Sequence, residues 1–79
     1  MSIHNVGIIM LKEEVGARLR ECRTAMGLTQ KEVAVRLGVA QPIYNRFENG
    51  VFECNYEQLK ALSQILDVST DYLLGISKY

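Results

Sequence analysis

The sequence has few of the residues that build disulfide frameworks and metal sites, and it has no long apolar run of the kind that spans a membrane. Its 79 residues include no tryptophan, one proline, one histidine and two cysteines. The longest uninterrupted apolar run is the segment 8–11, far short of the ~20 residues that a membrane-spanning helix needs. No basic start followed by a long apolar stretch, as in a secretory signal, stands at the N-terminus. We therefore expect a cytoplasmic protein with no membrane partner.

The cysteines and the histidine form no reactive or metal-binding pattern. Cys22 and Cys54 stand alone, without the CxxC or Cys/His spacing of a zinc site, and a reducing cytoplasm disfavours a disulfide between them. We expect Cys22 in the core and Cys54 in a loop. His4 has no cluster of Cys, Asp or Glu beside it. No nucleophile–base pair, carboxylate dyad or phosphate loop can be assembled, so we expect neither an enzyme nor a metal or cofactor.

An excess of charge of one sign is also missing, because nine basic residues balance nine acidic ones and the pI is near 6.6. Many nucleic-acid-binding domains are plainly basic, so this balance is evidence against DNA binding; it lowers the expected affinity more than it excludes DNA. The distribution is uneven, however. Five of the nine acidic residues lie from Glu48 onward. The first 46 residues contain most of the basic ones, among them Arg18, Arg20, Arg23, Lys31, Arg36 and Arg46.

The residues that are present predict one all-α domain over residues 12–79, preceded by an arm over residues 1–11 that is either flexible or a short strand. A first helix begins near Lys12 and ends before Gly27. Its expected apolar side consists of Val15, Leu19, Cys22 and Met26. Its expected outer side consists of Glu14, Arg18, Arg20 and Glu21.

Capping residues divide the rest of the chain into four further helices. Thr29, followed by Glu32, predicts a capping box that starts a second helix ending at Gly38. A third helix begins near Gln41 and ends at the segment 49–50, and helices over 55–66 and 70–74 follow. In the third helix, Tyr44 and Phe47 are expected to face inward. The residues expected to face outward are Gln41, Pro42, Asn45 and Arg46.

Two short helices joined by the turn 37–40, the second with a polar outer side, have the form of a helix-turn-helix unit. From Val15 to Gly75 the chain resembles the helix-turn-helix domain of the phage Cro and repressor family, also called the xenobiotic-response-element family. The matching landmarks are Val15-Gly16-x-x-Leu19, Cys22-Arg23, Gly27 to Gln30, Leu37-Gly38-Val39, Phe47 to Gly50, Leu59 to Leu62 and Val68 to Gly75. The resemblance implies a compact five-helix bundle of the lambda-repressor-like type.

The resemblance also implies a set of DNA-contact residues. Gln30 would meet a phosphate at the start of the second helix. Gln41 would read a base edge, for which its amide suits adenine. Arg46 could reach guanine or a phosphate. The remaining candidates for this surface are Lys31, Pro42, Asn45 and Asn49. The family also suggests that Arg23 and Glu48 form a partly buried, structural salt bridge.

Three features depart from the family pattern. Ala40 stands where a hydroxyl residue usually caps the reading helix. Tyr44 replaces an aliphatic residue. Val51, Phe52 and Glu53 stand where basic residues are common, which removes positive charge from the DNA side. Val51 and Phe52 either pack inward or form an apolar loop that binds a protein partner.

These observations predict a sequence-specific transcriptional regulator. We expect a repressor that binds double-stranded DNA in the major groove as a homodimer, on a pseudo-palindromic operator with half-sites about one helical turn apart. The candidate dimer surface is the N-terminal arm together with Tyr72, Leu73, Ile76 and Tyr79. The alternative hypothesis is a protein-interaction module on the same fold, in which DNA binding is weak or lost.

Overall fold

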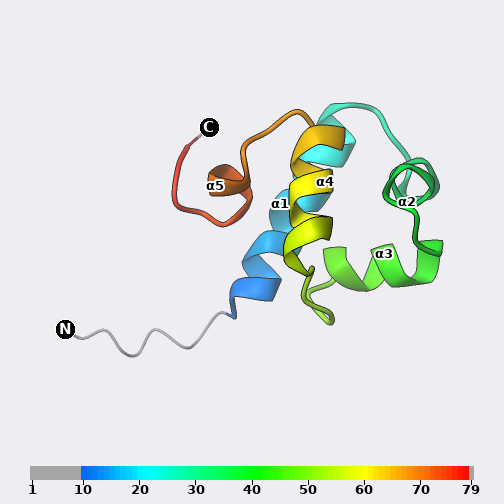
Figure 1. Cartoon of the computed structure of the whole chain (residues 1–79), viewed down its shortest axis with the longest axis horizontal. Coiled ribbons are helices and arrows are strands. Elements are labelled where there is room, and N and C mark those ends of the chain that lie inside the picture. The colour runs from blue at the N-terminus through cyan, green and yellow to red at the C-terminus, as the bar shows by residue number, and fades with distance from the viewer. Residues whose placement is uncertain (1–9, 79) are drawn as a thin grey trace.

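The computed structural model describes residues 10–78 and contains five helices and no strand in that range. The helices are α1 (Leu11–Ala25), α2 (Gln30–Leu37), α3 (Gln41–Glu48), α4 (Tyr56–Ile65) and α5 (Thr70–Leu73). α3 packs against α1 and α2, while α4 contacts α2 and α5, and α5 also contacts α1 (Figure 1). The predicted all-α, five-helix fold is confirmed. In the part of the chain that the structure describes, no helix is both long and apolar enough to span a bilayer.

The ends of α1 differ slightly from the prediction. The helix begins at Leu11, which the sequence had placed in the arm, and the carboxylate of Glu13 accepts a hydrogen bond from the Met10 N–H at 3.2 Å. The rest of the predicted arm, residues 1–9, lies outside the described residues. Met26, predicted on the apolar side, is 46% exposed because the helix stops at Ala25 and Gly27 turns the chain at φ +72°.

Capping hydrogen bonds fix the starts of α2 and α4. The Glu32 N–H donates to the Thr29 hydroxyl at 3.1 Å, and the Thr29 N–H donates back to the Glu32 carboxylate at 2.8 Å. Asn55 and Gln58 form the same reciprocal pair at the start of α4. α3 has no such bond, because its N-cap is Ala40. Proline in the first turn of α3 sacrifices no helical hydrogen bond and presets φ for the helix.

The core packs against the inner side of α3. The buried apolar residues are Val15, Leu19, Cys22, Val33, Ala34, Tyr44, Phe47, Leu62, Leu66 and Leu73. The rings of Tyr44 and Phe47 meet edge to face with centroids 6.4 Å apart, so both predicted inward positions of α3 are confirmed. Leu73 is fully buried, which excludes it from the predicted dimer surface.

α1 and α3 approach each other closely at Gly16. A Cβ atom at this position would lie 2.6 Å from the carbonyl oxygen of Glu48 and would also overlap the carbonyl oxygen of Phe47. Only the absence of a side chain lets the backbones come so near. Gly16 therefore sets the depth at which the end of α3 rests on α1.

Candidate nucleic-acid interface

α3 presents a short polar surface to solvent. Gln41, Pro42 and Arg46 are exposed, and Asn45 is half-buried. Together with Gln30 of α2 they line an open depression between the two helices. Among residues 10–78, the Gln41 side chain has no hydrogen-bond partner, so its amide is free to bind an external group. Lys31 is exposed beside Gln30.

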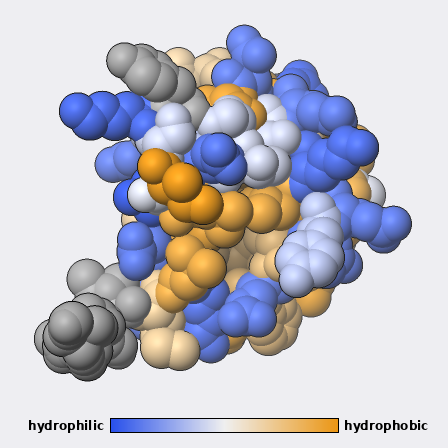
Figure 2. Space-filling view, turned by 60° about the vertical axis from the view of Figure 1, so that its left-hand side comes forward, coloured by the Kyte–Doolittle hydropathy of each residue, from blue (hydrophilic) through white to orange (hydrophobic). Residues whose placement is uncertain are grey.

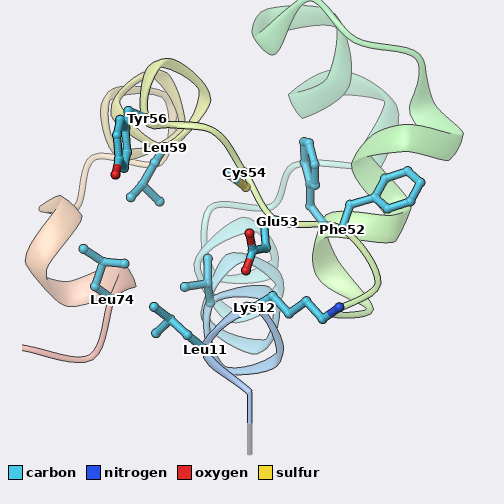
Figure 3. A pocket seen from close by; sticks show the side chains of 10 residues that line it. Leu11, Lys12, Phe52, Glu53, Cys54, Tyr56, Leu59 and Leu74 are labelled. Atoms are coloured by element: carbon cyan, nitrogen blue, oxygen red, sulfur yellow. The ribbon is translucent and has the colours of Figure 1, made fainter.

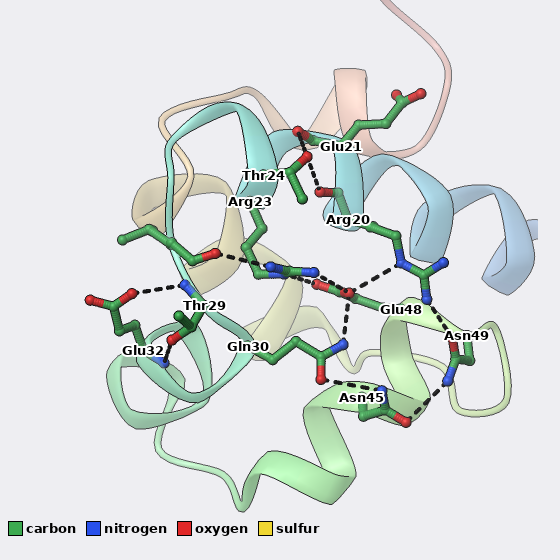
Figure 4. Close-up of polar contacts among 11 residues, drawn as sticks. Arg20, Glu21, Arg23, Thr24, Thr29, Gln30, Glu32, Asn45, Glu48 and Asn49 are labelled. Carbon is green, nitrogen blue, oxygen red and sulfur yellow. Dashed lines mark hydrogen bonds and ion pairs between the residues drawn. The ribbon is translucent and has the colours of Figure 1, made fainter.

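Behind this surface lies the buried carboxylate of Glu48, which is 4% exposed. Arg23 donates to its two oxygens at 2.6 and 3.1 Å, Gln30 donates at 3.0 Å, and the Arg20 Nε donates at 3.4 Å (Figure 4). The remaining nitrogen of the Arg23 guanidinium, Nη1, donates to the Leu28 carbonyl at 2.9 Å. The predicted pair of Arg23 and Glu48 thus ties α1 both to the end of α3 and to the segment before α2.

The burial of Glu48 and its hydrogen bonds shift the pKa values of this carboxyl and of its neighbours. Burial by itself would raise the pKa of the Glu48 carboxyl, but hydrogen bonds from Arg23 and Gln30 hold that pKa below its ordinary value of 4.5. Burial, and then the neighbouring Glu48 carboxylate, raise the pKa of the Tyr44 phenol. The pKa of the Arg23 guanidinium is raised, chiefly by its hydrogen bond to Glu48. The carboxylate is therefore ionised and paired at neutral pH.

Five side chains close a ring of hydrogen bonds around the end of α3 (Figure 4). Arg20 donates through Nη2 to the Asn49 oxygen, and Asn49 donates to Asn45 at 3.0 Å. Asn45 then donates to Gln30 at 3.2 Å, and Gln30 donates to Glu48. The Nε bond from Arg20 to Glu48 completes the ring. We call this set, Arg20, Gln30, Asn45, Glu48 and Asn49, the amide ring.

The ring shows which predicted site residues the fold brings together. Asn45 is hydrogen-bonded to both Gln30 and Asn49 in the ring, whereas Gln41 and Arg46 take no part in the ring but line the same depression as Gln30 and Asn45. Arg20 was not predicted as a site residue. The sequence placed it on the outer side of α1, where it is indeed exposed, but its guanidinium also contacts Glu48 and Asn49. Arg20 lies three residues before Arg23 and on the same side of the helix, which is the one sequence signal that could have found it.

Arg46 is held by the turn that follows α3. Its guanidinium lies 5.5 Å from the centre of the Phe52 ring, and one Nη donates to the Pro42 carbonyl at 3.4 Å. The N–H groups of Val51 and Phe52 both donate to the Arg46 carbonyl. Val51 and Phe52 are 53% and 42% exposed, so the alternative in which they pack inward is wrong.

Another side of the molecule is apolar. A groove of about 190 Å³ lies among the start of α1, the loop after α3, and helices α4 and α5 (Figure 3). Its lining includes Leu11, Phe52, Cys54, Leu59 and Leu74. Figure 2 shows apolar side chains gathered around a hollow on the side where α5 and the N-terminal end of α1 lie. Burial raises the pKa of the Cys54 thiol to about 11, so this cysteine is un-ionised at neutral pH.

Two short helices with a tight turn between them, a polar exposed side on the second and a buried ion pair behind it define a helix-turn-helix unit. The chain belongs to the helix-turn-helix family, whose sequence profile matches residues 19–73. It is 46% identical over 56 residues to the HTH-type transcriptional regulator YqaE of Bacillus subtilis (strain 168), covering 71% of this chain and 48% of that protein. The chain spans about half the length of the curated relatives it matches.

Solved structures show the same fold. The clp gene regulator ClgR from Corynebacterium glutamicum superposes with a TM-score of 0.82 at 29% identity, covering 86% of this chain and 72% of that one. The P22 c2 repressor, solved in complex with a synthetic operator, superposes with a TM-score of 0.75 at 33% identity, covering 80% and 96%. The resemblance to the phage Cro and repressor family inferred from the sequence is thereby confirmed.

Proposed function

We propose that this chain binds DNA as a transcriptional regulator and reads the major groove with α3. The observation that carries the proposal is the exposed polar side of α3, where Gln41 is free of internal partners and Arg46 lies beside it. The P22 c2 repressor of similar fold was solved with an operator, and YqaE is named a transcriptional regulator. We assign Gln41 to a base edge, Arg46 to a base or a phosphate, and Lys31 to a phosphate.

The finer features of the proposal concern assembly and the sign of regulation. One short reading helix offers few base contacts, so two copies on a pseudo-palindromic operator would be needed for useful selectivity. We therefore propose a homodimeric repressor that acts on cytoplasmic DNA. Ile76, which is 72% exposed, and the half-buried Tyr72 remain candidates for the dimer surface. Tyr79 and residues 1–9 lie outside the described residues.

Selection of duplexes from a random library tests the proposal. We expect a symmetric motif that the wild type binds more tightly than scrambled DNA in fluorescence anisotropy. Replacing Gln41 by alanine should cost about 1–3 kcal/mol on that motif and relax the preference at one base pair, because a bidentate contact is lost. The double variant Gln41→Ala/Arg46→Ala should lose the preference for the motif.

The matched control changes an amide and a cation elsewhere. Gln64 and Lys60 are exposed on α4, which contributes nothing to the candidate surface. The variant Lys60→Ala/Gln64→Ala should bind the motif as the wild type does. If no motif is enriched even at low salt, DNA reading by α3 is wrong.

The second candidate function is a protein-interaction module. The exposed side chains of Val51 and Phe52 and the neighbouring apolar groove favour it, because such a surface suits an apolar partner. The same selection experiment separates the two functions. Enrichment of a duplex supports DNA binding, whereas an absence of enrichment makes this groove the functional surface to test.

A further inference from the structure

We propose that Arg20 is a phosphate-contact residue of the DNA interface, held in place by the amide ring, and that Asn45 and Asn49 are positioning residues rather than base readers. This inference rests on the proposed DNA-binding function and assigns roles within it. The amide ring holds the Arg20 guanidinium in position, and the net positive charge around Glu48 attracts a phosphate.

The charge argument begins at Glu48. Arg23 alone satisfies both carboxylate oxygens, at 2.6 and 3.1 Å, in the bidentate geometry that pairs one guanidinium with one carboxylate. Arg20 adds a second positive charge to the same carboxylate through a longer bond of 3.4 Å. The cluster of two arginines and one glutamate therefore has an excess positive charge at the end of the reading helix.

The exposure of Arg20 places that excess charge where DNA could meet it. Its side chain is 51% exposed, compared with 14% for Arg23. Its Nε and Nη2 are bonded within the ring, and within residues 10–78 its Nη1 has no partner. Asn49, which the Nη2 contacts, is also exposed. A guanidinium held at two points with one nitrogen free is ordered before binding, which lowers the entropy lost on contact with a phosphate.

The roles of the two asparagines follow from which of their atoms are engaged. Recognition of adenine by an amide side chain needs its oxygen and its nitrogen together. In Asn45 both are used, since the nitrogen donates to Gln30 and the oxygen accepts from Asn49. In Asn49 the oxygen accepts from Arg20 and the nitrogen donates to Asn45. Gln41, by contrast, has both amide atoms free, so Gln41 is the amide side chain that reads a base edge.

Salt dependence of binding tests the role of Arg20. With anisotropy on the selected motif and on scrambled duplex, the Arg20→Gln variant should bind both more weakly and leave their affinity ratio unchanged. The slope of log affinity against log salt should fall by about 0.9 for each bound copy. Between 50 and 200 mM salt the wild type should then lose about 3.5-fold more affinity per copy than the variant. Arg20→Lys should keep the slope, because the charge remains.

Arg18 provides the matched control on the same helix. Its guanidinium packs against Gly75 after α5 and pairs with Glu14 at 3.6 Å, away from α3. Arg18→Gln should retain the wild-type salt slope, and thermal melts should show that each variant folds. A wild-type slope in Arg20→Gln, or a loss of the affinity ratio alone, would overturn the phosphate contact. Failure of the wild type to prefer any duplex would instead overturn the proposed function.

Separate measurements test the positioning role of Asn45 and Asn49. Repeating the selection with Asn45→Ala should return the wild-type motif with lower affinity, because the base contacts come from other residues. Asn49→Ala and Arg20→Gln should be less than additive in affinity when combined, since both act through one guanidinium. A changed base preference in the Asn45→Ala motif would make Asn45 a reader and overturn this part of the inference.

Discussion

Glu48 keeps a full negative charge in a place that water hardly reaches. Taking a carboxylate out of water costs several kcal/mol, which only short, charged hydrogen bonds offset. Arg23 supplies two of these bonds, and Gln30 supplies a third. Removing either charged partner would leave the other buried and uncompensated, at a cost of about 3–5 kcal/mol. That is a large share of the stability of so small a domain.

Acid should therefore unfold the protein through Glu48. Because the pKa of Glu48 is lower in the folded chain than its ordinary value of 4.5, its contribution to stability is complete above pH 4.5 and is lost as pH falls further. We expect the free energy of urea unfolding to drop as pH falls below 4.5, because the unfolded chain then takes up a proton at Glu48 more readily than the folded chain does. Glu48→Gln should be less stable at pH 7 and should lose most of this acid dependence.

Two further measurements make the acid prediction secure. Glu53→Gln, a change of an exposed carboxylate after α3, should keep the acid dependence of the wild type. Glu32 will retain part of it in every variant, because the hydrogen bond from the Thr29 backbone lowers its pKa. The Glu48 side-chain carbon signal of the wild type, followed by NMR, should titrate below pH 4.5. A midpoint at or above that value contradicts the prediction even if Glu48→Gln does not fold.

For single residues, the sequence predicted the roles that follow from residue type and spacing. The pair of Arg23 and Glu48 followed from the family resemblance, and the inward positions of Tyr44 and Phe47 followed from helical periodicity. Arg20 did not, because a residue at the edge of an apolar stripe faces solvent or a neighbouring helix according to the angle at which that helix packs. Helical periodicity carries no information about that angle.

Among the helices, capping chemistry decides the boundaries. Side-chain oxygens that can accept an N–H mark the starts of α2, α4 and α5, and the predicted starts of these helices agree with the structure. α1 starts at Leu11 after Met10, an N-cap residue that has no side-chain oxygen to accept an N–H, and there the prediction was one residue late. The C-terminal end of α1 was harder to predict, because Met26 continues the apolar spacing although the helix has already stopped.

The contact between α1 and α3 predicts that a glycine-to-alanine change lowers the stability of the protein, although such a change usually stabilises a helix. Replacing glycine by alanine inside a helix normally stabilises it by about 1 kcal/mol. Gly16→Ala should instead destabilise the fold by about 1–3 kcal/mol, because the new methyl group would overlap backbone oxygens of α3 that cannot move aside easily. Chemical denaturation measures this directly. Ala17→Ser, at the exposed neighbouring position, should change stability little, and a stabilised Gly16→Ala would disprove the close contact.

For the molecule as a whole, the sequence predicted five helices and their order but not which surface meets a second copy. Such a surface is set by what remains exposed after packing, and Leu73 shows how an apolar residue near the C-terminus can belong wholly to the core. Ile76 is left as the large exposed apolar residue after α5 in the described part of the chain.

The proposed dimer can be tested through this residue. Ile76→Asp should reduce the mass found by light scattering from that of two chains to that of one, because a buried charge without a partner disfavours association. Val35 on α2 is 70% exposed, close to the 72% of Ile76, and Val35→Asp should leave the mass unchanged. An unchanged mass for Ile76→Asp would remove this residue from the dimer surface.

The amide ring has a direction. Arginine can only donate hydrogen bonds and an ionised carboxylate can only accept them. Each of the three amides between Arg20 and Glu48 must therefore turn its oxygen towards the arginine and its nitrogen towards the glutamate, since reversing any one would set like groups face to face. The two charged ends thus fix the same orientation for the three neutral side chains, and either end alone would still impose it along the edge of α3.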